Sequence, residues 1–230
     1  MKNTMETKVA NVQEKLNVFG SKSFSQPVIA GSVGVKGAAS FKEDVQAAEF
    51  SVIGDCVIRG SLTVKSFSNS GACKIKGISQ FNEMKNIGSC RLGKVQTKHI
   101  YSSGTLSVKE DVHAESFTVQ GAVRVHGNLQ AKKIGIQFIS PSELQNVEGD
   151  IIMIVPSRKF ISLTSFIPGI KKRIACKTIT ENDITLSKTE ASLVSGHHIK
   201  IGSNCHVGEV EYSGTLDIDP CASVGKITRV

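Results

Sequence analysis

Three cysteines recur at a spacing that would bring their sulfur atoms together in a regularly coiled chain. Cys56, Cys73 and Cys90 stand at every seventeenth position, and each follows a glycine by two positions, in the segments GDCVIRG, GACKIKG and GSCRLGK. Thiolates bind zinc, and neighbouring thiols form disulfides. Against both, no Cys-x-x-Cys pair occurs, and the same position of the repeat holds Ala39 and Leu106. We therefore predict small, buried and reduced side chains, with no bound metal.

Histidines are the other candidates for acid–base chemistry. Left-handed β-helix acyltransferases use a histidine base on strict hexapeptide turns, and pectin-lyase-type enzymes gather several acids and arginine on one face; neither pattern repeats here. The chain also has no P-loop and no Gly-x-Gly-x-x-Gly that opens a helix, so no nucleotide site is predicted. We expect neither enzymatic activity nor a cofactor. The histidines considered are His99, His113, His126, His197, His198 and His206.

The cysteines belong to a periodicity that extends over most of the chain. Glycines at 20, 37, 54, 71 and 88 recur at every seventeenth position, and glycines at 104 and 121 continue the series. Three apolar columns run in step with them. The first is Phe50, Phe67, Met84, Tyr101, Phe117, Ile134 and Ile151; the second is Phe41, Ile58, Ile75, Leu92, Val108 and Val125; the third is Ala39, Cys56, Cys73, Cys90, Leu106 and Val123.

Each repeat has the alternation of short β-strands. In FSVIGDCVIRGSLTVKS (50–66), apolar residues alternate with mostly polar ones and glycines interrupt the pattern. Side chains of a strand alternate between its two faces, and glycine allows a corner where a side chain would clash or need a positive φ. We predict an all-β fold, a parallel β-helix of about 17 residues per turn, with equivalent residues stacked in columns.

The register divides the chain into four segments. We predict a flexible tail at 1–14, β-helix turns at 15–155, an insertion at 156–173 and further turns at 174–230, all in one solenoid domain. The residues that carry the register after the insertion are Ile184, Ile201 and Ile218, then Leu193, Val210 and Ile227, and the pair Ile199 and Leu216.

Charge and hydropathy limit the possible partners. The 230 residues have a net charge of +8 and contain 40% hydrophobic residues. Five of the 28 basic residues lie in the insertion, which leaves 23 basic against 20 acidic residues elsewhere. A general nucleic-acid-binding surface is therefore poorly supported. With no signal peptide and no apolar stretch of membrane-spanning length, we expect a soluble cytoplasmic protein, with the inner face of the cell membrane as a second setting.

The insertion combines apolar and basic side chains, and two interpretations fit it. It could lie in an anionic membrane interface, with apolar side chains inserted and basic ones at the headgroups. Alternatively, it could fold against the β-helix or cap one end, with its basic residues solvated. The residues assigned to the membrane contact are Arg158, Lys159, Phe160, Phe166, Ile167, Lys171, Lys172 and Arg173.

Laid out in turns of this length, the sequence resembles the bactofilin family of polymer-forming bacterial cytoskeletal proteins over about residues 16–230. FTVQGAVRVHGNLQAKK (117–133) and its sister turns match the family's pattern of an apolar start, a glycine and an apolar-x-apolar-x-Gly run. LVSGHHIKIGSNCHVGEVEYSGTLDIDPCASVGKI (193–227) resembles the C-terminal module of longer, Bacillus-type members. The chain departs from the family in its insertion and in lacking Pro-rich tails.

This resemblance implies a right-handed parallel β-helix that assembles end to end without nucleotide. It also implies a scaffold that localises client proteins for cell shape, envelope, division or motility, with a second copy or a related bactofilin as partner. The alternative is a discrete β-helical binding module that does not polymerise alone. Unpaired strand edges at the terminal turns would form the polymer contacts. We assign these contacts to Phe41, Val45, Leu216, Ile218, Val224 and Ile227.

Overall fold

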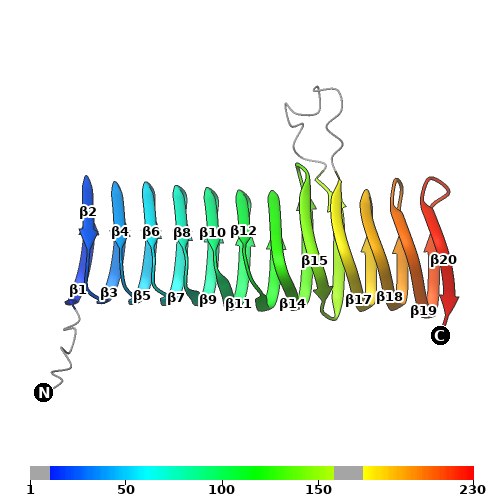
Figure 1. Cartoon of the computed structure of the whole chain (residues 1–230), viewed down its shortest axis with the longest axis horizontal. Helices are drawn as coiled ribbons and strands as arrows, with labels where there is room; N and C mark the ends of the chain where they lie inside the picture. The colour runs from blue at the N-terminus through cyan, green and yellow to red at the C-terminus, as the bar shows by residue number, and fades with distance from the viewer. Residues whose placement is uncertain (1–10, 158–172) are drawn as a thin grey trace, which may run out of the picture.

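The computed structural model describes residues 11–157 and 173–230, and within these ranges the chain forms 20 β-strands and no helix. All strand pairs are parallel, and the strands stack into a solenoid of about 12 turns with about 17 residues per turn (Figure 1). The predicted all-β parallel β-helix is therefore confirmed.

Long and short strands alternate along the first half of the solenoid. The long strands are β1 (Asn11–Val18), β3 (Val28–Val35), β5 (Val45–Val52), β7 (Leu62–Asn69), β9 (Ile78–Asn86), β11 (Lys94–Ser102) and β13 (Val112–Val119). The short strands are β2 (Ser21–Phe24), β4 (Ala38–Phe41), β6 (Asp55–Ile58), β8 (Ala72–Ile75), β10 (Ser89–Leu92) and β12 (Thr105–Val108).

In the second half, several strands run through the corner that separates the short and long segments. These strands and their neighbours are β14 (Ala122–Phe138), β15 (Ser142–Glu148), β16 (Ile151–Pro156), β17 (Ile174–Leu186), β18 (Thr189–Ile201), β19 (His206–Ile218) and β20 (Ser223–Arg229). Between the ends of the solenoid, strands pair with their equivalents in the turns before and after them, so like positions lie above one another.

The interior is one continuous stack of the predicted columns. The second and third columns are buried along their whole length, and their members pair in register from turn to turn. Phe50 pairs with Phe67, and Phe117 occupies the same column further along. Rings also stack between turns: the Phe24 and Phe41 centroids are 4.7 Å apart. The apolar core is therefore shared between neighbouring turns, as solenoid stability requires.

The prediction for the first column is wrong at two positions. Ile100 rather than Tyr101 pairs with Met84, and Ile152 rather than Ile151 pairs with Ile134. Tyr101 and Ile151 are exposed instead. The shift to Ile100 begins at the corner after Leu92, where the step between paired residues falls from 17 to 16, because Arg91 pairs with Lys74 but Lys94 pairs with Ile78. With one residue fewer at this corner, the next inward position of the column is Ile100 rather than Tyr101.

The register after the insertion also differs from the prediction in two places. Ile184 pairs with Ile199, a step of 15, whereas Ile201 pairs with Leu186. Val194 rather than Leu193 pairs with Val210. The predicted pairs Ile201 with Ile218, Ile199 with Leu216 and Val210 with Ile227 are confirmed. Shorter corners in this part of the solenoid account for the differences.

The segment boundaries need one correction. Strand β1 begins at Asn11, so residues 11–14 belong to the first turn rather than to a tail. Pro156 ends β16, and Ile174 begins β17 on the far side of the insertion. Residues 1–10 and 158–172 lie outside the described part of the chain.

The repeating glycines are explained by close approach between turns. A Cβ built on Gly54 would lie 2.0 Å from the carbonyl oxygen of Gly37, one turn earlier. Among the described glycines, only Gly20 has a positive φ. Of the two predicted reasons for glycine at these corners, the steric one therefore applies to the stacked series.

Candidate functional site

The two ends of the solenoid have free strand edges. Within the described residues, β1 pairs only with β3, β2 only with β4, and β20 only with β19. The last residues of β19, which pair with β18 on one side, have no strand on the other. Such edges leave backbone N–H and C=O groups available to another strand.

The C-terminal end is also apolar. Leu216, Ile218 and Val224 continue the interior columns but are only partly buried, and Ile227 is 51% exposed. In the first turn, by contrast, the corresponding Leu16, Val18 and Phe24 are buried. The two ends therefore differ, and the C-terminal end has an incompletely covered core layer. We call Leu216, Ile218, Val224 and Ile227 the terminal layer.

The predicted polymer-contact residues fall into two groups. The four from the C-terminal part of the chain form the terminal layer. Phe41 and Val45 do not lie at an end, because the Phe24 ring stacks on Phe41 and Val28 pairs with Val45. Both are fully buried one turn inside the N-terminal end. The turn that begins near residue 15 therefore lies between these two residues and the N-terminal end of the described solenoid.

Ion pairs surround the terminal layer. Lys226 Nζ lies 2.5 Å from Glu209 Oε1, and Lys200 Nζ lies 3.2 Å from Asp217 Oδ2. The hydrogen bond to Glu209 raises the pKa of Lys226. Each pair joins one turn to the next, so the last turns are held together at their solvent-facing rim while their apolar side stays open.

The residues assigned to a membrane contact are mostly outside the described chain. Arg158, Lys159, Phe160, Phe166, Ile167, Lys171 and Lys172 fall in the undescribed range. Arg173 is described, and its guanidinium forms an ion pair with Glu190 in the next turn. The Arg173 charge is therefore paired within the solenoid, and its assignment to a membrane contact stays a prediction.

The three recurring cysteines are buried, as predicted. Cys56, Cys73 and Cys90 are buried free thiols stacked in one column. A thiol hydrogen bond to Cys73, together with burial, raises the pKa of Cys56 far above its ordinary value. All six histidines are exposed. No group of three or more His, Cys, Asp or Glu that could hold a metal occurs in the parts of the chain described.

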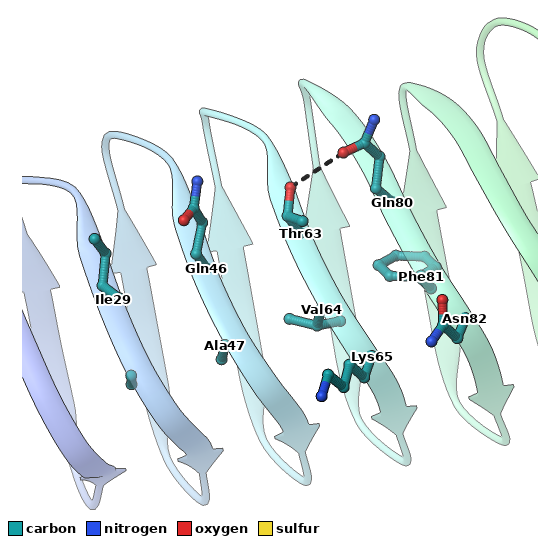
Figure 2. Close-up of a pocket in the computed structure, with 10 residues that line it drawn as sticks. Ile29, Gln46, Ala47, Thr63, Val64, Lys65, Gln80, Phe81 and Asn82 are labelled. Carbon is teal, nitrogen blue, oxygen red and sulfur yellow. Dashed lines mark hydrogen bonds between the residues drawn. The ribbon is translucent and has the colours of Figure 1, made fainter.

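A shallow groove follows one corner of the solenoid, with a volume of about 530 Å³. Figure 2 shows Gln46, Thr63 and Gln80 along one rim, with Val64 and Phe81 on the floor. Thr63 Oγ1 donates to Gln80 Oε1 at 3.4 Å. These side chains form a polar ladder between turns, and the small alanines beside Phe81 create the hollow. The lining holds no acid–base pair or nucleophile suited to catalysis.

Sequence reasoning missed a basic surface on the short-strand side. Counting charge along the chain gave little excess outside the insertion, but stacking brings distant cations together. A signal was present, because Lys42, Arg59 and Lys76 recur in the same register as the corner glycines. We call the following residues the basic face: Lys42, Arg59, Lys74, Lys76, Arg91, Lys109 and Arg124.

The architecture defines a parallel β-solenoid protein with open strand edges at both ends of its described residues. None of those residues belongs to a helix able to cross a membrane. The chain matches no protein-family model, no curated protein and no solved structure.

Proposed function

We propose that this protein is a non-enzymatic scaffold that assembles end to end, without nucleotide, and localises other proteins. The observation that carries the proposal is the incompletely buried terminal layer at a free strand edge. Terminal repeats of a monomeric solenoid need a polar outer face to stay soluble. Here the last turn instead leaves Ile227 more than half exposed and Leu216, Ile218 and Val224 incompletely covered.

A second molecule docked on this end would satisfy both features. Strand addition would pair the free backbone groups of β20 and of the end of β19. The same contact would remove the terminal layer from water, which favours association by roughly 25 cal/mol per Å² of apolar surface buried. The ion pairs of Lys226 with Glu209 and of Lys200 with Asp217 join neighbouring turns beside this surface.

The resemblance to bactofilins supports the same function. It covers the turns that form the solenoid and the C-terminal segment that provides the terminal layer. On this proposal the partner is a second copy or a related bactofilin, the clients are other proteins, and the setting is the cytoplasm.

Electron microscopy and sedimentation velocity of the purified chain without nucleotide test the proposal. We expect filaments or large end-to-end oligomers. Ile218→Asp should abolish them while most of the circular dichroism signal remains, because only the last turn loses its packing. Ile78→Asp is the matched control, since Ile78 is an exposed isoleucine on the side of the solenoid. It should assemble like the wild type.

Two outcomes would contradict end-to-end assembly. One is that the wild-type chain stays monomeric or dimeric, both alone and with a related solenoid protein from the same cell, which would favour the discrete binding module. The other is that Ile218→Asp and Ile78→Asp assemble equally well, which would place the contact elsewhere.

A further inference from the structure

The basic face is a compact array rather than scattered charge. The backbone N–H of Arg59 bonds to Phe41 O at 2.8 Å, and that of Lys76 bonds to Ile58 O at 2.9 Å, so Lys42, Arg59 and Lys76 follow equivalent positions of successive turns. Parallel strands are about 4.8 Å apart. The backbone positions of neighbouring cationic residues are therefore closer than a Debye length of about 8 Å, a spacing at which their potentials add.

A second basic column lies beside the first. Lys74 and Arg91 pair in register at the middle of β8 and β10, and Arg124 continues the column in β14. Figure 1 shows these short strands side by side along the solenoid. The cations span successive turns and point away from the core, because the residues that alternate with them are the buried second and third columns.

Some acidic residues next to the basic face accept hydrogen bonds from backbone N–H groups or form ion pairs. Asp44 Oδ1 accepts a hydrogen bond from Ser61 N at 2.7 Å, and Asp111 Oδ1 accepts one from Asn128 N at 2.9 Å. Glu143 pairs with Arg124 at 3.6 Å, at the end of the array. On β6 and β8, the middle short strands, Asp55 is the single acidic side chain. At the centre of the face, Arg59, Lys74, Lys76 and Arg91 therefore outnumber the single acidic residue Asp55.

Three exposed apolar residues, each two turns from the next, flank the same short strands. Phe19 is 67% exposed, Ile53 is 61% exposed and Ile87 is 54% exposed. These residues precede β2, β6 and β10 at one corner, whereas Lys42, Arg59 and Lys76 follow β4, β6 and β8 at the opposite corner. Lys36 also lies on the ridge, with its Nζ 5.5 Å from the Phe19 ring centroid. We call Phe19, Ile53 and Ile87 the apolar ridge.

We propose that the basic face and the apolar ridge together bind the surface of an anionic lipid bilayer. Cations at one corner would lie at the lipid phosphates, while isoleucine and phenylalanine side chains at the other enter the acyl boundary. A nucleic acid would use the cations but not the aliphatic ridge, since single strands are held by aromatic stacking and the two isoleucines have no π face. The paired features therefore favour a bilayer.

Most of this surface lies along the side of the solenoid, away from the terminal layer, and of its residues Phe19 belongs to the first turn. The surface runs along the solenoid axis, so a bilayer bound there leaves the free edges of β1 and β20 open. Lipid binding can therefore be tested independently of end-to-end assembly. The test remains valid even if the chain stays monomeric.

Vesicle flotation of the full chain tests the proposal, because polymer without lipid does not float. The probes are phosphatidylcholine vesicles with and without phosphatidylglycerol. The triple variant Arg59→Gln, Lys76→Gln, Arg91→Gln should lower the partition coefficient onto anionic vesicles by about 100-fold, at about 1 kcal/mol per charge. A matched triple variant, Lys65→Gln, Lys98→Gln, Lys132→Gln, removes three exposed lysines from a long-strand face. It should bind almost as the wild type does.

A separate double variant tests the contribution of the apolar ridge. Ile53→Ser with Ile87→Ser should weaken flotation about tenfold, as expected if two partly inserted side chains are lost. The proposal is overturned if the wild type does not float with anionic vesicles, or if the two triple variants lose binding equally. It is also overturned if the chain binds oligodeoxythymidine more tightly than the vesicles and the Ile53→Ser, Ile87→Ser variant keeps both affinities unchanged. Circular dichroism melts of every variant establish that the fold is retained.

Discussion

Inside the solenoid, Asn69 Nδ2 donates a hydrogen bond to Asn86 Oδ1 at 2.8 Å, and neither side chain is exposed to solvent. Asn86 Nδ2 in turn donates to Ser102 Oγ at 2.9 Å. Val52 and Val119 occupy the same column in the turns on either side. Three polar residues are therefore accommodated in an apolar column because each turn provides the partner for the next.

Asn86→Ala tests how much the buried hydrogen bonds of Asn69, Asn86 and Ser102 contribute to the stability of the fold. The substitution leaves Asn69 and Ser102 without their shared partner in a buried site, so we expect the free energy of unfolding to fall by about 2 to 3 kcal/mol. Asn82→Ala, at an exposed position of the same strand, should change it by less than about 0.5 kcal/mol. Urea denaturation measures both values. Equal effects would contradict a stabilising role for these hydrogen bonds.

Phe67→Asp tests the shared aromatic core. The Phe67 ring centroid lies 5.1 Å from that of Phe81 and 6.1 Å from that of Phe50. A carboxylate there would be buried without a partner, at a cost of several kcal/mol. We expect loss of the β signal in circular dichroism and rapid proteolysis, whereas Phe67→Leu should remain folded with a lower melting temperature. A folded Phe67→Asp chain would contradict one continuous core.

Thiol reactivity tests the burial of the cysteine columns. Of the six cysteines only Cys221 is exposed, whereas burial raises the pKa of Cys176 to about 12 and also raises the pKa of Cys205. In the native protein we expect one fast-reacting thiol per chain with Ellman's reagent, and six in denaturant. Cys221→Ser should remove the fast phase. A second fast thiol in that variant would show that a buried column opens.

Glu181 gives a prediction for pH dependence. Burial raises the pKa of its carboxyl, and nearby Asp150 and Glu148 add to the rise, although hydrogen bonds from Asn182 N and Gly149 N oppose it. The folded state thus holds the proton more tightly than the unfolded chain. The contribution to stability is present at acidic pH and is lost as pH rises through the folded pKa.

Glu181→Gln should remove that pH dependence while keeping the oxygen that accepts from Gly149 N. We expect the variant to gain melting temperature relative to the wild type as the pH rises from acidic to neutral. Differential scanning calorimetry across this range measures the difference. A constant difference, or one of opposite sign, would contradict the raised pKa.

The fold was predictable because stacked turns must repeat one backbone path. Because the path repeats about every 17 residues, similar residues recur at that spacing. Examples are the corner glycine Gly54 and the buried columns that contain Cys56 and Phe67. The same repetition did not reveal where a turn is one residue shorter. Tyr101 and Ile100 fit the apolar pattern equally well, and only the corner after Leu92 decides which of them faces inward.

The sequence by itself determined the strand period, the all-β class and most of the core, because these depend on local alternation and on the spacing of equivalent positions. Only the tertiary structure decided which residues lie at an open end and which cations share a face. Phe41 is covered by Phe24, whereas Ile227 is left exposed, and Arg59 and Lys76 stand at equivalent positions of adjacent turns. Such neighbours depend on the summed lengths of all the corners between them, which no local pattern specifies.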